Sequence, residues 1–229
     1  MATAVVRYTA AAVTDRGRKR SSNEDAFGYS VEHGVYIVCD GMGGAAAGEV
    51  ASSLAVEEVL KLVTERVTER VTDRATVHAT ANTEEDDNAS QHSLPSIAEE
   101  AVIAANHAIH SRAQRNARLN GMGTTLVALL ASMPEEDRRI WILNVGDSRC
   151  YRLRDRHIEL CTQDHSLVEE QVRLGRMSRS EAARSPLRNV ITRALGTQVS
   201  VTPDLIEAEV EPGDLFLLCS DGLTRELSD

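Results

Sequence analysis

The chain has 229 residues, and its 35 acids and 25 bases give a formal net charge of −10. This length is sufficient for one large domain with a hydrophobic core. The excess of acids argues against a nucleic-acid-binding protein, because phosphate contacts need a positive surface. No apolar run approaches the roughly 20 residues of a membrane helix, and no signal-peptide pattern opens the chain. We therefore expect a cytoplasmic globular protein without a membrane segment, whose four scattered cysteines are free.

The N-terminal half begins with a predicted strand followed by a long predicted helix. Residues 35–39 form a short apolar run, typical of a buried strand, that ends abruptly at Asp40-Gly41. Small residues follow, and the pattern then becomes helical. Residues 63–74 contain three copies of Val-Thr-acid-Arg, and we expect them to form a solvated extension of the helix.

A polar segment separates this helix from a second one. Residues 76–95 are rich in Thr, Glu, Asp, Asn and Ser and predict a loop. Ser96 and Glu99 have the spacing of a capping box, which predicts the start of the second helix. We therefore expect residues 1–229 to form a single domain with a polar helix extension and loop insertion at about 63–95.

The C-terminal half is dominated by apolar runs with the period of strands. Strands are predicted at residues 124–130, 139–145, 150–153, 158–161, 201–210 and 215–219. A mixed, partly helical stretch lies between the fourth and fifth of these. A strand, two helices and then a run of strands predict an α+β sandwich with helices over sheets, rather than alternating βαβ units.

Two of the apolar strands end in an aspartate followed by a glycine. These pairs are Asp40-Gly41 and Asp221-Gly222. If the two strands lie side by side, the carboxylates would repel each other strongly unless a divalent cation lies between them. Oxygen ligands favour Mg²⁺ or Mn²⁺ over zinc or copper. Taken alone, such a pair is more often a simple turn.

Two further segments strengthen the interpretation as a reactive site. Arg20 shortly precedes Glu24 and Asp25, and Asp147 follows another apolar strand. A guanidinium group is well suited to bind the oxygens of a phosphate. Acids at three strand ends, together with this arginine, predict metal-assisted attack of water on a phosphate ester.

Seven short motifs occur in order along nearly the whole chain. They are Arg20-x-x-Asn23-Glu24-Asp25, then residues 38–44, 123–125, 144–149, 162–166, 191–196 and 219–224. In this order they resemble the metal-dependent serine/threonine protein phosphatases of type 2C, in their bacterial style. The resemblance implies a four-layer α-β-β-α sandwich of two antiparallel sheets flanked by helices.

The resemblance also implies a role for each acidic residue. Asp40 would bridge two Mn²⁺ or Mg²⁺ ions, and the Gly41 carbonyl would ligate one of them. Asp221 would ligate a metal on the opposite side, and Glu24 would act mainly through bound water. Asp147 would belong to a third, weaker metal site.

The activity that the resemblance implies is hydrolysis of phosphoserine and phosphothreonine in proteins. A water or hydroxide that bridges the two ions would attack phosphorus, while Arg20 holds the phosphate. The partners would be phosphorylated proteins, either kinase substrates or a kinase. Some relatives carry a histidine where this chain has Met42, so the general acid is unassigned. His165 is one candidate, although a structural role is favoured for it.

The resemblance is incomplete at the C-terminus. Relatives continue into a helix and a final strand, with a further metal-ligand aspartate before that strand, whereas this chain ends at Asp229. We therefore expect a truncated domain whose last strand or strands are missing and whose metal affinity is reduced. The alternative is a non-catalytic phosphatase-like binding or regulatory module. The presence of all five charged site residues favours the enzyme.

Overall fold

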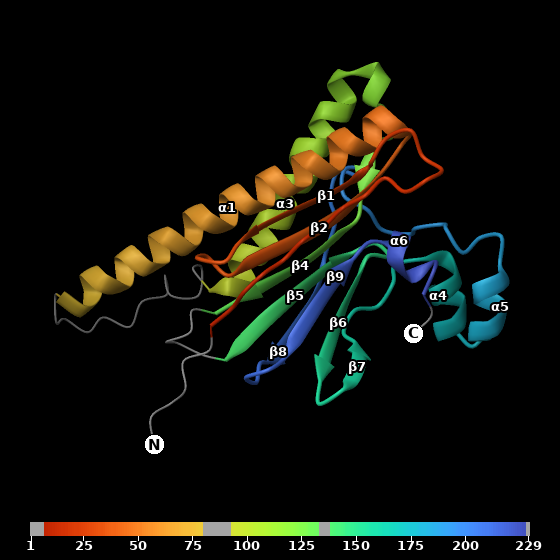
Figure 1. Cartoon of the computed structure of the whole chain (residues 1–229). Helices are drawn as coiled ribbons and strands as arrows, with labels where there is room; N and C mark the ends of the chain where they lie inside the picture. The colour runs from red at the N-terminus through yellow and green to blue at the C-terminus, as the bar shows by residue number, and fades with distance from the viewer. Residues whose placement is uncertain (1–6, 80–92, 133–137, 228–229) are drawn as a thin grey trace.

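The computed structural model describes residues 7–79, 93–132 and 138–227, whose strands form two antiparallel sheets (Figure 1). The strands are β1 (Asp25–Ser30), β2 (Val35–Met42), β3 (Gly123–Thr124), β4 (Leu126–Ala131), β5 (Arg139–Val145), β6 (Arg149–Arg154), β7 (His157–Leu160), β8 (Asp204–Glu209) and β9 (Leu215–Cys219). The larger sheet has the order β1-β2-β4-β5-β8, with β3 paired to β2, and the smaller has the order β7-β6-β9. The predicted sandwich of antiparallel sheets is confirmed.

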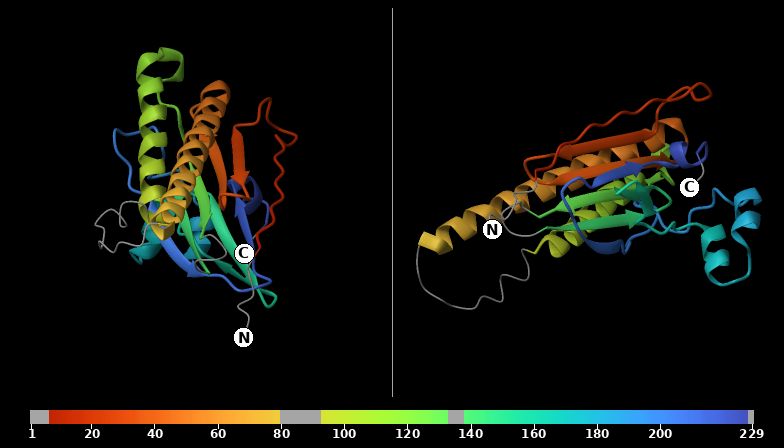
Figure 2. Two further views of the ribbon diagram at one scale, coloured as in Figure 1. Left: turned by 90° about the vertical axis from the view of Figure 1, so that its left-hand side faces the viewer. Right: turned by 60° about the horizontal axis from the view of Figure 1, so that its bottom comes forward.

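Two long helices lie over one face of the larger sheet (Figures 1 and 2). The helices are α1 (Ala45–Ala79), α3 (Leu94–Arg115), the 3-10 helix η1 (Ala117–Leu119), α4 (Leu167–Arg173), α5 (Arg179–Arg184) and α6 (Asp221–Thr224). The central strand β4 is buried at every position, because the long helices cover one of its faces and the smaller sheet covers the other. None of the described helices is long and apolar enough to cross a membrane.

The valine repeat of α1 is only partly solvated. Val63 and Val67 are buried in the core, whereas Val71 is 44% exposed. Arg66 pairs with Glu69 at 3.0 Å and also with Glu100 of α3 at 2.7 Å. The first part of the repeat therefore packs against α3, and the expected solvated extension begins only near Val71.

The second long helix begins earlier than the capping-box pattern predicted. Ser93 is the N-cap of α3, and its side chain accepts a hydrogen bond from the Ser96 backbone at 3.4 Å. The predicted cap at Ser96 is therefore wrong. Pro95 fits within the first turn because its missing N–H would have no helical partner there. The predicted loop is helical up to Ala79, and its central residues, 80–92, lie outside the described residues.

The outer face of the smaller sheet is apolar and exposed. Leu153, Ile158 and Leu215 are 40%, 58% and 55% exposed, respectively. Over the described ranges, α4 and α5 lie beyond the end of the sheets rather than across this face (Figure 1). The described residues thus show three of the four implied layers: the paired helices, the larger sheet and the smaller sheet.

Candidate metal centre

The predicted acidic residues meet at one end of the sandwich. Asp40 lies near the end of β2, Asp147 follows β5, and Asp221 is the first residue of α6, directly after β9. The two Asp-Gly strands are in contact but are not neighbours within one sheet, because β2 belongs to the larger sheet and β9 to the smaller. The two sheets pack face to face and both strands end at the same side (Figure 1). The carboxylate of Asp221 therefore lies close enough to Asp40 to raise the pKa of the Asp40 carboxyl group.

The carboxyl group of Asp40 lies at the centre of this acidic cluster. Burial raises its pKa to about 8, with further contributions from the carboxylates of Asp221, Asp25 and Asp147, against an opposing effect of Arg20. Like charges held this close in a partly buried site favour protonation unless a cation compensates them. The cluster therefore has the electrostatics of a cation site.

Asp147 contributes a buried oxygen that has no protein donor. Asp147 is only 9% exposed, and its Oδ1 has no hydrogen-bond partner. Burial, followed by the carboxylates of Asp221 and Asp164, raises the pKa of Asp147 to about 6. A buried acceptor without a donor costs free energy, so a ligand at this atom would relieve that cost.

Two threonines hold the backbone of Asp40. The Asp40 N–H donates to Oγ1 of Thr125 at 2.9 Å, and its carbonyl accepts from the Thr125 N–H and the Thr124 hydroxyl, each at 2.9 Å. The Thr125 hydroxyl is also 2.7 Å from that of Ser148. This network gives the Gly-Thr-Thr motif a local function, which is to fix the peptide that carries the central carboxylate.

Gly41 allows the first turns of α1 to approach β2. A Cβ atom at Gly41 would lie 2.0 Å from the carbonyl oxygen of Gly48. The Gly41 N–H donates to the carbonyl of Glu24 at 3.0 Å, which ties the segment before β1 to the same place. The glycine is thus required by the close contact of three backbone segments.

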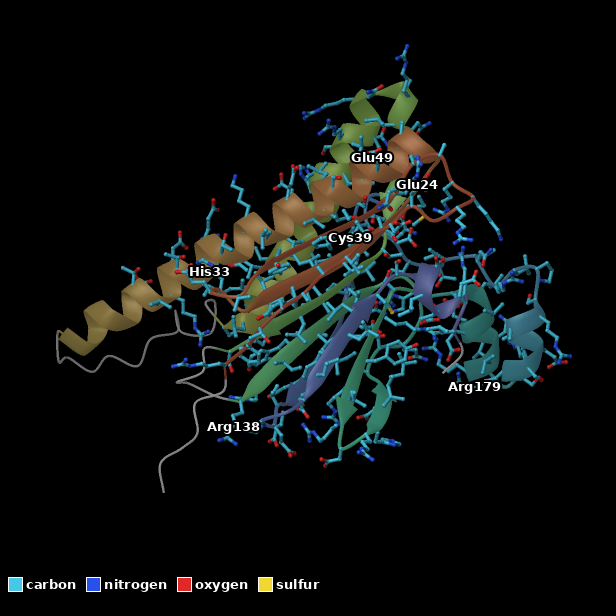
Figure 3. The ribbon with its side chains drawn as sticks, in the orientation of Figure 1. Glu24, His33, Cys39, Glu49, Arg138 and Arg179 are labelled. Carbon is cyan, nitrogen blue, oxygen red and sulfur yellow. The ribbon has the colours of Figure 1, made fainter. Side chains whose placement is uncertain are left out.

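Arg20 and Glu24 lie at the border of the cluster. Nη1 of Arg20 is 3.6 Å from Oε2 of Glu24, and the arginine side chain is 52% exposed. Figure 3 shows Glu24 close to the start of α1. Burial raises the pKa of both Asp40 and Asp221, and the Arg20 guanidinium opposes this rise, so its charge acts on the cluster while the group remains accessible from solvent.

The structure adds two residues that the sequence interpretation left without a role. Asp25 is opposite Asp40 in the β1–β2 ladder, and it accepts a 2.8 Å hydrogen bond from the Ser220 hydroxyl. Arg225 forms an ion pair with Asp221, four residues earlier. The signal for Asp25 was its place beside Glu24, but without a predicted β1 its register was unknown. The signal for Arg225 was its place four residues after Asp221, a spacing that brings two side chains together only if a helix begins at Asp221.

The donor set fits a hard divalent cation, although it is not arranged as a complete site. Among the described residues, no three or more His, Cys, Asp or Glu side chains are already placed so that together they could hold a metal ion. The cluster nevertheless offers oxygen donors, raised carboxyl pKa values and the orphaned Oδ1 of Asp147. Arg225 currently compensates part of the negative charge by pairing with Asp221.

Arg225→Ala should strengthen Mn²⁺ binding, because the guanidinium competes for the Asp221 carboxylate. The pair is partly exposed, so we expect its loss to be worth about 0.2–1 kcal/mol, or up to about fivefold in affinity. Calorimetric titration of the substrate-free protein with MnCl₂ measures this. Arg118→Ala removes an exposed arginine of η1 and serves as the charge-matched control. Unchanged or weaker binding in Arg225→Ala would contradict the assignment.

An acidic cluster of oxygen donors beside an accessible arginine, at the end of a two-sheet sandwich, has the chemistry of a metal-dependent phosphate-ester hydrolase. Residues 14–229 match the family model for protein phosphatase 2C. The chain is 37% identical over 215 residues to the serine/threonine phosphatase stp of Listeria monocytogenes serotype 4b (strain F2365), covering 93% of this chain and 76% of that relative. The chain belongs to the protein phosphatase 2C family, as the motifs predicted.

Solved structures agree with this assignment. The serine/threonine phosphatase PstP/Ppp of Mycobacterium tuberculosis superposes with a TM-score of 0.75 at 35% identity, covering 94% of this chain and 79% of that one. The catalytic domain of PstP in complex with two manganese ions gives a TM-score of 0.72 at 34% identity, covering 94% and 78%. The predictions of a metal-dependent serine/threonine phosphatase and of Mn²⁺ or Mg²⁺ as its cofactor are confirmed, and the non-catalytic alternative is not favoured.

Proposed function

We propose that the acidic cluster at the end of the sandwich is the active centre with which this chain hydrolyses phosphoserine and phosphothreonine in proteins. The observation that carries the proposal is the surroundings of Asp40. Three other carboxylates act on its carboxyl group, whose pKa is raised to about 8. Such a group becomes a strong ligand when divalent cations compensate the charge.

The residues divide between two core ions and a weaker third one. Asp40 would contact both core ions, with the Gly41 carbonyl on one and Asp221 on the other. Glu24 would act through water, and Asp147 would hold the third ion through its orphaned Oδ1. When bound, the ions would supply Lewis acidity, which activates water as a nucleophile and offsets the charge of the phosphate.

The chain's own groups orient the substrate and the site. The accessible guanidinium of Arg20 would hold the oxygens of the phosphate, as a fixed fork of N–H donors does well. Thr124 and Thr125 would keep the Asp40 peptide from moving during turnover, because they engage both its N–H and its carbonyl. Charged groups that are held in place before the reaction, such as the Arg20 guanidinium, stabilise charge that develops in the transition state.

Arg20→Ala should raise KM for a phosphothreonine peptide about tenfold and lower kcat much less. A charge-assisted hydrogen bond contributes about 1.5–3 kcal/mol, and the exposure of Arg20 favours the lower end of this range. Steady-state kinetics at saturating Mn²⁺ separates the two parameters. A large fall in kcat at constant KM would instead place Arg20 in the transition state. Arg20→Lys keeps the charge without the fork and should lie between the two.

The proposed substrates are phosphorylated proteins, either kinase substrates or a kinase itself. A cytoplasmic setting is supported by the four cysteines, none of which forms a disulfide in the described residues. Cys39, Cys150 and Cys219 are buried, where a thiol behaves as a small apolar side chain.

Release of phosphate from matched peptides tests the proposal. We expect Mn²⁺-dependent hydrolysis of phosphoserine and phosphothreonine peptides, abolished by EDTA and restored by added Mn²⁺. Binding of these peptides without release of phosphate at millimolar Mn²⁺, in a folded sample, would instead identify a binding module. Melting of the same sample by circular dichroism establishes that it is folded.

A further inference from the structure

A buried histidine contacts the turn that carries Asp147. His165 is only 7% exposed. Its Nδ1 accepts a hydrogen bond from the Gly146 N–H at 3.0 Å, and the backbone N–H of His165 donates to the Gly146 carbonyl at 2.8 Å. Both backbone polar groups of Gly146 are therefore bonded to one residue, directly before Asp147.

The far side of the imidazole faces the carboxylate of Asp204. Nε2 lies 3.1 Å from Oδ2 of Asp204, off the line of a good hydrogen bond, and Arg193 donates to Oδ1 of Asp204 at 2.6 Å. The His165 carbonyl accepts from the Thr192 N–H at 2.8 Å. Burial lowers the pKa of His165, which keeps the Nδ1 lone pair available. Because Nε2 is buried and Nδ1 is engaged, neither nitrogen is free to donate a proton to a leaving group.

The turn is also in contact with the strand segment that fixes Asp40. Gly146 has a φ of +109°, and a Cβ atom there would lie 2.6 Å from Cγ2 of Thr125. The hydroxyl of Thr125 accepts the Asp40 N–H. Gly146 is therefore enclosed between His165 and Thr125, and a shift of this turn would move Asp147 relative to Asp40.

We propose that His165 is a positioning residue that fixes the Gly146 peptide and thereby aims the Asp147 carboxylate into the acidic cluster. The inference rests on the proposed function of that cluster. This role of His165 differs from general packing, because it requires the hydrogen-bond acceptor at Nδ1 and not only the volume of the ring. Groups that orient a metal ligand from behind typically contribute about 10- to 100-fold in metal affinity or activity.

Two amide variants distinguish loss of the hydrogen-bond acceptor at the Nδ1 position from loss of the imidazole ring. In His165→Asn the amide oxygen can take the place of Nδ1, whereas in His165→Gln the amide reaches toward Asp204 and the acceptor for Gly146 is lost. In calorimetric titrations with MnCl₂, without substrate, we expect His165→Gln to weaken the weakest binding phase about tenfold. His165→Asn should remain within about threefold of the wild type. Equal weakening in both variants would overturn the proposal.

The same variants in an Asp147→Asn background show whether His165 acts through Asp147. We expect the difference between His165→Gln and the parent to disappear there, and its persistence would overturn the proposal. Melting without Mn²⁺ reports the integrity of each variant.

A measurement on the unmodified protein keeps the proposal testable if a variant does not fold. A scalar coupling across the hydrogen bond from the Gly146 amide nitrogen to Nδ1 of His165 should be observed by NMR in the metal-free chain, and its absence would contradict the positioning role of His165. This measurement needs no catalysis, so failure of the positioning role is distinguishable from failure of the proposed function.

Discussion

Asp40→Asn should reduce Mn²⁺-dependent release of phosphate by about 10³-fold or more, which corresponds to about 4 kcal/mol of lost transition-state stabilisation. The substitution keeps the shape of the side chain but removes the charge that both core ions would share. Phosphate release from a phosphothreonine peptide, measured at saturating Mn²⁺, tests this. A rate close to that of the wild type would refute the two-ion assignment.

The same substitution should stabilise the metal-free protein at pH 8. The folded pKa of Asp40 is raised to about 8 from an ordinary value of 3.8, so the folded chain binds more protons than the unfolded chain between these values. Stability is therefore lost as the pH rises from about 4 to about 8. Asparagine avoids that loss, and its advantage in melting temperature should shrink toward pH 4. Calorimetric melting across this range measures it.

Asp155→Asn is the matched control for both readouts. Asp155 is exposed in the turn between β6 and β7, away from the cluster, and its φ of 49° suits asparagine. We expect it to leave activity and the pH dependence of melting unchanged. A melting temperature of Asp40→Asn that is below that of the wild type at pH 8 would contradict the electrostatic interpretation of the cluster.

Gly41→Ala should destabilise the fold by about 3 kcal/mol or more, and the surviving folded protein should bind Mn²⁺ poorly. The new methyl group would be 2.0 Å from the Gly48 carbonyl oxygen and 2.8 Å from the Glu24 carbonyl oxygen. These are backbone atoms, so relief requires α1 or the segment before β1 to move, which also displaces Asp40. Urea unfolding monitored by circular dichroism gives the change in the free energy of unfolding.

Gly222→Ala is the control, because it changes the glycine of the other Asp-Gly pair. Its nearest neighbour would be the Ser220 Oγ at 3.6 Å, which is ordinary contact. We expect a change in stability below about 0.5 kcal/mol. Equal stabilities of the two variants would show that the close approach of α1 to β2 is not required.

Strands that are buried or bounded by strong turns could be predicted from the sequence. The predicted strands at residues 139–145 and 215–219 coincide with β5 and β9, because each is an apolar run closed by polar turns. β1 was missed because Asp25–Ser30 lies at a sheet edge, is half-buried and carries no apolar run. The cap of α3 was misplaced because a proline in the first turn hides the start of the helix.

The acids of the site could be predicted from motif spacing, but their arrangement could not. Asp40, Asp147 and Asp221 each follow or close an apolar strand, which is a local signal. Their assembly depends on two sheets packing face to face, which no local pattern encodes. The contributions of Asp25 and Arg225 likewise depend on a strand register and a short helix that only the folded chain defines.

Anomalous scattering at the manganese edge, from crystals of the full chain grown with MnCl₂, tests the central claim most directly. We predict two strong peaks beside the Asp40 carboxylate, one close to the Gly41 carbonyl and one close to Asp221, and a weaker peak at Oδ1 of Asp147. Manganese bound elsewhere, with no peak at this end of the sheets, would contradict the assignment of the acidic cluster as the metal centre.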